Sequence, residues 1–97
     1  MNPQPSKQFL ANLIAFRREQ FVQTLADNEA LLADGFEEAL IGHTNGHNVV
    51  AVYDYDLCVQ ILMEGEGMST EDAIEFMEFN VVGSYVGEKT PVFISLS

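Results

Sequence analysis

The residues best suited to chemistry begin with two histidines in the middle of the chain. His43 and His47 are four residues apart, a spacing that on a helix could bring two imidazoles to one metal ion. Here the pair straddles Asn45-Gly46, a dipeptide that favours a two-residue type I′ turn. Two neutral donors also fall short of the four ligands of a closed zinc site. We therefore expect turn residues here and no metal.

Two carboxylates two residues apart, Asp54 and Asp56, could belong to a calcium loop. Such a loop needs further oxygen ligands and a bidentate glutamate at a fixed later position. Glu64 and Glu66 come too late for that pattern. The residues between, Leu57 to Met63, also have the apolar spacing of a helix and not of a loop. Capping of a helix that starts near residue 55 explains Asp54 or Asp56 more simply.

The single cysteine, Cys58, lies between Leu57 and Val59 on the expected inner face of this helix. A free cysteine in such a place is usually a small buried hydrophobic residue. The sequence contains no nucleophile elbow, no P-loop and no dinucleotide-binding glycine motif. We expect a protein that is not an enzyme and that carries no cofactor.

Charge is the strongest remaining signal. The 97 residues contain 15 Asp or Glu and 4 Lys or Arg, a net charge of −11. Residues 1–26 carry a net charge of +2 and residues 27–97 a net charge of −13. A polyanion is repelled by nucleic-acid backbones and by anionic membranes, so we expect no direct binding to either. The charge either serves a cationic partner or only confers solubility or salt tolerance.

The partner hypothesis depends on a row of carboxylates. Acids on successive turns of a helix lie about 5–6 Å apart and give a rigid row of the same sign of charge as a nucleic-acid backbone. Such a row could occupy the basic groove of a nucleic-acid-binding protein. The candidate contacts are Glu71, Asp72, Glu75 and Glu78, followed by Asp54 and Asp56. The alternative is an ordinary solvated helix face.

These residues must be positioned by a small set of elements. Ser6 can cap a first helix, whose apolar residues recur at spacings of three, four and seven from Phe9 to Leu25. This helix either runs to about Leu32 or breaks near Asp27-Asn28. Residues 38–43 and 48–53 are expected to form a hairpin around Asn45-Gly46.

Two shorter helices and a strand follow. Ser69 is the expected cap of the third helix, in which Ala73, Ile74, Met77 and Val81 should face inward and Glu71, Glu75 and Glu78 outward. Pro91 leads into a last strand, residues 92–94, expected to lie antiparallel beside the hairpin. The predicted fold is α+β, with a long N-terminal helix and two shorter helices packed on an antiparallel sheet of about three strands.

Length and composition set the remaining limits. The 97 residues suit one small domain, with residues 1–5 expected to be flexible. No apolar run is long enough to span a membrane, no secretory signal is evident and a lone cysteine fits a reducing compartment. The first helix carries surplus apolar residues, and Phe9, Leu13 and Phe16 are the expected homodimer interface. The alternative is that the phenylalanines of this helix, Phe9, Phe16 and Phe21, all reach the monomer core.

The second half of the chain resembles a family of small uncharacterised proteins encoded by bacteriophages. The likeness rests on Tyr53-Asp54-Tyr55, on Met68 to Ala73, and on Phe79-Asn80-Val81-Val82-Gly83-Ser84-Tyr85-Val86-Gly87-Glu88-Lys89-Thr90-Pro91. Residues 1–35 lie outside it. The resemblance implies a phage context and the bacterial cytoplasm, and it transfers no catalytic residue.

Together these observations predict a non-enzymatic inhibitor. Its partner would be a basic surface on a host nucleic-acid-binding machine, such as a CRISPR effector or a restriction complex, so that the chain would act as an anti-CRISPR or related DNA mimic. The alternative is a structural, assembly or adaptor protein that oligomerises through the N-terminal helix.

Overall fold

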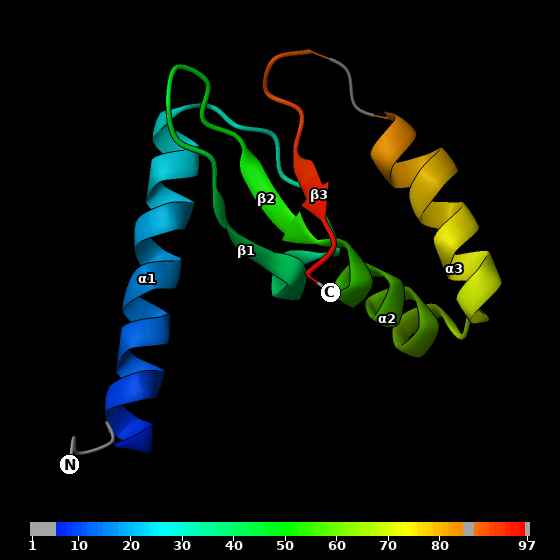
Figure 1. Ribbon diagram of the computed structural model, residues 1–97, viewed down its shortest axis with the longest axis horizontal. Coiled ribbons are helices and arrows are strands. Elements are labelled where there is room, and N and C mark those ends of the chain that lie inside the picture. The colour runs from blue at the N-terminus through cyan, green and yellow to red at the C-terminus, as the bar shows by residue number, and fades with distance from the viewer. Residues whose placement is uncertain (1–5, 85–86, 97) are drawn as a thin grey trace.

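The computed structural model describes residues 6–84 and 87–96, so the expected flexibility of residues 1–5 lies outside the described residues. The fold is α+β, as predicted, with one long and two shorter helices beside a three-stranded sheet (Figure 1). In chain order the elements are α1 (Lys7–Asp27), a 3₁₀ turn (Glu37–Ala39), β1 (Leu40–His43), β2 (Ala51–Asp54), α2 (Tyr55–Glu66), α3 (Thr70–Phe76) and β3 (Val92–Ile94). A π-helical segment (Met77–Val81) and a 3₁₀ turn (Val82–Ser84) continue α3.

Side-chain caps fix the start of each helix. The hydroxyl oxygen of Ser6 accepts from Phe9 N at 3.0 Å, and that of Ser69 accepts from Asp72 N at 3.1 Å. Asp54 caps α2, because its Oδ1 accepts from Leu57 N at 3.1 Å. Each bond satisfies a backbone donor that the first helical turn leaves free, and both predicted serine caps are confirmed.

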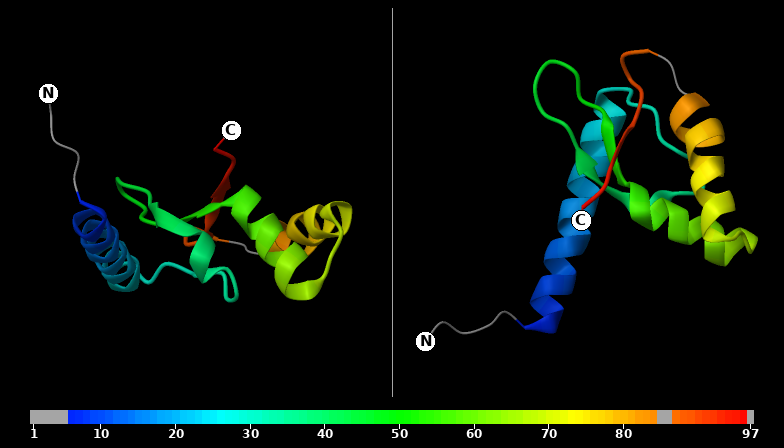
Figure 2. Two further views of the ribbon diagram at one scale, coloured as in Figure 1. Left: turned by 90° about the horizontal axis from the view of Figure 1, so that it is seen from below. Right: turned by 45° about the vertical axis from the view of Figure 1, so that its right-hand side comes forward.

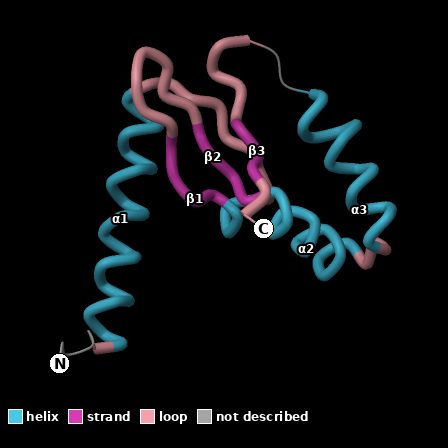
Figure 3. Tube along the Cα trace, in the orientation of Figure 1, coloured by secondary structure: helices cyan, strands magenta, loops and turns pink. Residues whose placement is uncertain are grey.

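The sheet corrects one expectation. β1 and β2 are antiparallel, but β3 lies parallel to β2, with Val52 opposite Val92 and Tyr53 opposite Phe93. The sheet is therefore mixed, and the prediction of a purely antiparallel sheet was wrong. The α2–α3 hairpin carries the chain back to the starting end of β2, and a strand entered from that end runs parallel (Figure 3).

The hairpin is present, but its turn differs from the prediction. The strands are shorter than expected, and residues 44–50 form a longer connection closed by Thr44 N donating to Val50 O at 2.9 Å. Gly46 has a φ of 108°, whereas Asn45 is not among the described residues with positive φ. A type I′ turn requires positive φ at both positions, so this one does not form.

One face of the sheet carries the core. Ala51 and Tyr53 are buried on it, and Tyr53 stacks on Phe93 with ring centroids 5.4 Å apart. The Tyr53 hydroxyl accepts from Ala33 N at 2.8 Å, which fixes the irregular segment after α1 over this face. The buried cluster also includes Leu25 of α1, Leu62 of α2 and Met77 beyond α3.

The long helix extends well past this core. α1 ends at Asp27 and Asn28 caps it, so the predicted break is confirmed and the longer alternative is wrong. The C-terminal part of α1 lies beside β1, whereas its N-terminal part projects beyond the sheet (Figures 1 and 2). Leu25 is 1% exposed, but Ile14, three turns earlier on the same side, is 65% exposed.

Candidate functional site: an acidic ridge on α3

Three of the predicted contact residues form a ridge on α3 and its continuation. Glu71, Glu75 and Glu78 recur at spacings of four and three, so they occupy neighbouring turns of one helix side. All three side chains are exposed. We call these three residues the α3 ridge. The predicted placement of these acids on the outer side of the helix agrees with the structure.

The other predicted contacts are arranged differently. Asp72 is also exposed, but it follows Glu71 by one residue and is therefore turned about 100° away around the helix. Asp54 is half-buried, and its Oδ1 is occupied by the N-terminal backbone of α2. Asp72 therefore lies beside the ridge, as a neighbour of Glu75 three residues on, whereas Asp54 has a capping role.

Tyr55 connects the ridge to α2. Its hydroxyl donates to Glu78 Oε1 at 3.0 Å. Burial raises the pKa of Tyr55, as do this hydrogen bond and the nearby negative charges of Glu78 and Asp56. The carboxylates of Asp56 and Glu78 therefore act on the same hydroxyl, and the anionic surface continues from α3 onto the first turn of α2.

An apolar groove of about 380 Å³ lies between α2 and α3 beside this surface. Its lining includes Val59 and Met63 from α2 and Ile74 from α3, with Tyr55 and Asp56 at one end. The prediction that Ile74 faces the core was wrong, because its side chain is 42% exposed in this groove. Thr70 and Ile74 are four residues apart, so helical spacing places Ile74 on the same side of α3 as an exposed threonine. This spacing could have indicated that Ile74 does not face the core.

Cys58 is a packing residue of the core. Its side chain is fully buried in the core cluster. Burial, with a smaller contribution from Asp54, raises the pKa of its thiol to about 12. A thiol held in its neutral form is a poor nucleophile, so the geometry agrees with the expected packing role.

The two histidines point to no metal centre in the described part of the chain. His43 Nδ1 lies 2.7 Å from the carbonyl oxygen of Thr44, and His47 is exposed in the hairpin connection. Among residues 6–84 and 87–96, no three His, Cys, Asp or Glu side chains gather closely enough to hold an ion.

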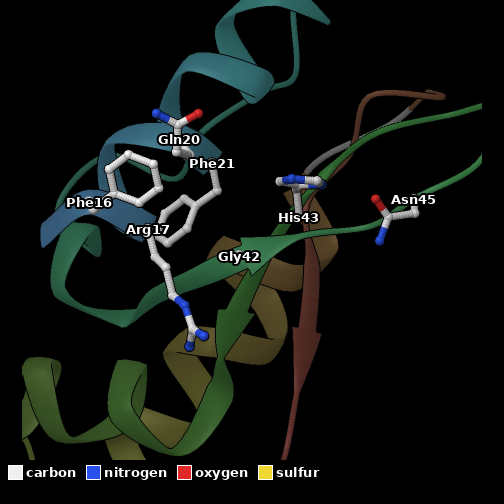
Figure 4. A pocket seen from close by; sticks show the side chains of 7 residues that line it. All are labelled: Phe16, Arg17, Gln20, Phe21, Gly42, His43 and Asn45. Atoms are coloured by element: carbon white, nitrogen blue, oxygen red, sulfur yellow. The ribbon is translucent and has the colours of Figure 1, made fainter. Parts of the chain in front are cut away.

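A second cleft, of about 420 Å³, lies between α1 and the hairpin. Phe16 and Phe21 line it from α1, and His43 and Asn45 face them from the hairpin (Figure 4). Arg17 extends away from His43 in this view, so the cationic group and the imidazole do not converge. The cleft provides aromatic surface without a paired acid and base.

The residues predicted to form an oligomer interface lie in the N-terminal half of α1, where Phe16 also borders the cleft beside the hairpin. Phe9 is 57% exposed and Phe16 is 58% exposed, whereas Leu13 is half-buried. The alternative that Phe9, Phe16 and Phe21 all reach the monomer core is therefore wrong for the first two, whereas Phe21 packs against the core. Phe9 and Phe16 form an apolar surface that the described part of the chain leaves uncovered.

Comparison with known proteins gives no relative: no protein-family model, no curated protein and no solved structure matches this chain. Within the described residues, no helix combines the length and apolar character needed to cross a bilayer. The functional argument therefore rests on the chain's own surface chemistry.

Proposed function

We propose that this chain is a non-enzymatic protein that binds a basic surface of a nucleic-acid-binding machine and excludes the nucleic acid from it. The observation that carries the proposal is the α3 ridge with its extension through Tyr55 to Asp56. Carboxylates on successive turns offer a basic groove a rigid row of negative charges, the sign of charge that a nucleic-acid backbone presents.

The apolar groove beside the ridge supports the same partner class. An isolated exposed ion pair contributes only about 0.2–1 kcal/mol, so charge alone gives weak binding. Lys and Arg carry aliphatic stems that can pack on apolar surface while their charged ends reach carboxylates. Met63 and Ile74 provide such a surface within the groove next to Asp56. The Lys and Arg side chains of a basic helix or strand can therefore pack their aliphatic stems in the groove while their charged ends reach the carboxylates.

For the biological setting we propose a bacteriophage, the source of the small proteins that the second half of the chain resembles. A phage protein that acts in the bacterial cytoplasm is exposed to host defence complexes that bind DNA or RNA in basic channels. We propose such a complex, a CRISPR effector or a restriction enzyme, as the partner class. The inhibitor would compete electrostatically, so its binding should weaken as salt screens the charges.

The test compares two variants with the same change in net charge. The ridge variant carries Glu71→Lys, Glu75→Lys and Glu78→Lys, and the matched control carries Asp34→Lys, Glu38→Lys and Glu88→Lys, three exposed acids away from the ridge. Each, with the unchanged chain, serves as bait in bacterial lysate at low and high salt. We expect nucleic-acid-binding proteins to be retained at low salt by the unchanged chain and by the control only.

The affinity of the purified partner then gives the quantitative result. We expect the ridge variant to bind at least about a hundredfold more weakly, because three attractions become repulsions, and the control to bind within about threefold of the unchanged chain. The unchanged chain should also displace DNA or RNA from the partner in a gel-shift assay. Equal losses in both variants would show that only net charge matters and would overturn the ridge proposal.

The exposed phenylalanines of α1 favour a second candidate, an assembly or adaptor protein that oligomerises through this helix. Phe9 and Phe16 are each more than half exposed, and large contiguous apolar surfaces usually mark interaction sites. A variant with Phe9→Ser and Phe16→Ser separates the two candidates. Loss of partner capture together with loss of the oligomer would favour assembly, whereas capture by the monomeric variant would favour the ridge.

A further inference from the structure

The helix α1 has two apolar sides, and the described part of the chain covers each of them only in part. Leu10, Ile14, Phe21 and Leu25 fall within about 60° of one another around the helix axis. Phe21 is half-buried and Leu25 is buried, so this side faces the body of the molecule at its C-terminal end. It accounts for the packing of α1 on its own chain.

The second side is turned about 120° from the first. It consists of Phe9, Leu13, Phe16 and Gln20, at spacings of four, three and four. This alternation is that of the core positions of a two-stranded coiled coil. We call these four residues the free seam. Phe16 and Gln20 also border the cleft between α1 and the hairpin (Figure 4), so a helix packed on the seam would cover part of that cleft.

Charge along the chain indicates what covers the seam. Residues 7–18 carry three cations, Lys7, Arg17 and Arg18, and no acid. Residues 19–29 carry three acids, Glu19, Asp27 and Glu29, and no cation. Lys7 and Asp27 stand at the helix ends where each opposes the helix dipole. This polarity is unfavourable within one helix and becomes favourable when a second copy lies antiparallel beside it.

We propose that α1 pairs with α1 of a second copy of this chain, in an antiparallel two-fold dimer through the free seam. Phe9 and Leu13 of one copy lie level with Gln20 and Phe16 of the other, and Lys7 of each approaches the acidic stretch of the other. The two-fold symmetry uses the same surface twice, as in most homodimers. A parallel pair would instead set like charges against each other.

This inference deepens the second candidate function and does not depend on the α3 ridge. The first test is the mass in solution by sedimentation equilibrium. We expect twice the 10.8 kDa of the chain. Phe9→Ser with Phe16→Ser should give the monomer mass and an unchanged circular dichroism spectrum. Val22→Ser, an exposed apolar residue on neither side of α1, is the matched control and should remain dimeric.

The second test addresses the charges. A chain with Lys7→Glu and Arg17→Glu, and another with Glu19→Lys and Asp27→Lys, should each dimerise at least about tenfold more weakly at low salt. Mixing the two should restore a heterodimer, because each acidic half then meets a basic half.

The third test fixes the direction of pairing. Phe9 and Gln20, near opposite ends of the free seam, lie level with each other across an antiparallel pair. Chains with Phe9→Cys and chains with Gln20→Cys, mixed under mild oxidation, should form the mixed disulfide, while Cys58 stays buried. A monomer mass for the unchanged chain, a dimer that survives the phenylalanine variant, or a dominant Gln20→Cys self-pair would each overturn the proposal. None of these results would affect capture of a basic partner by the α3 ridge.

Discussion

At the scale of single residues, Cys58 shows how environment decides chemistry. A thiol with a pKa of about 12 has a thiolate fraction at pH 8 of roughly one part in ten thousand, about a thousandfold below an exposed thiol. We expect negligible reaction of the native protein with a thiol reagent at pH 8 and complete reaction once it is unfolded in guanidinium chloride. Rapid labelling of the native chain would contradict the buried packing role.

The same shift makes stability depend on pH. The folded state holds the Cys58 proton more tightly than the unfolded chain, whose thiol has the ordinary pKa of 9.0. The corresponding stability is present below about pH 9 and is lost as the pH rises from there towards 12. Denaturant midpoints measured across this range should fall more steeply for the unchanged chain than for Cys58→Ala, in which this titration is absent.

At the scale of elements, two glycines in helical segments should respond in opposite ways to alanine. A Cβ on Gly83, just after the π-helical segment, would lie 2.9 Å from the backbone oxygen of Glu78. A Cβ on Gly65, inside α2, would meet no heavy atom within 4 Å. Gly83 therefore permits a close backbone approach, whereas Gly65 only lowers the helix propensity of α2.

We expect Gly83→Ala to lower the free energy of unfolding by about 1–3 kcal/mol, because backbone must move to admit the methyl group. Gly65→Ala should raise it by about 0.5–1 kcal/mol. Urea denaturation followed by circular dichroism measures both, and each variant serves as the other's control. Stabilisation by Gly83→Ala would show that the end of the π-helical segment is not as close-packed as described.

The elements also show which parts of the fold a sequence can specify. Ser6 and Ser69 were identifiable as caps because capping depends on neighbours within three residues. The side of α3 that carries Glu71, Glu75 and Glu78 was identifiable from helical spacing alone. These predictions needed no knowledge of the rest of the chain.

Other features depended on distant parts of the chain. The parallel pairing of β3 with β2 follows from the direction in which the α2–α3 hairpin returns, which no local pattern in residues 92–94 encodes. Ile74 sits in a groove because Tyr55 and Met63 of another helix form its opposite wall. The link from Tyr55 to Glu78 joins residues 23 positions apart and could not be seen in either segment.

At the scale of the whole molecule, a net charge of −11 on 97 residues should destabilise the folded state by self-repulsion. Raising NaCl from about 0.05 to 0.5 M shortens the screening length from about 14 to 4 Å. We therefore expect the Tm to rise, with each kcal/mol gained appearing as about 4–8 °C in a domain of this size. Thermal melts followed by circular dichroism measure the shift.

The ridge variant provides the internal comparison, since replacing three Glu by Lys changes the net charge from −11 to −5. Its Tm should depend less on salt and should be higher than that of the unchanged chain at low salt. A Tm independent of salt in both proteins would show that repulsion between the acidic side chains is weak. The net charge of the chain would then not lower the stability of the folded state.

The parallel strand β3 has a consequence for the order of folding. Its partner β2 lies 40 residues earlier in the chain, as the pairing of Val52 with Val92 shows. The β1–β2 hairpin can form from residues close in the chain. The edge of β2 that pairs with β3 stays unpaired until α2 and α3 have formed and brought the chain back beside it. That transient open edge is the natural point for misassembly between nascent copies, and the speed with which the helical hairpin closes determines how long it is exposed.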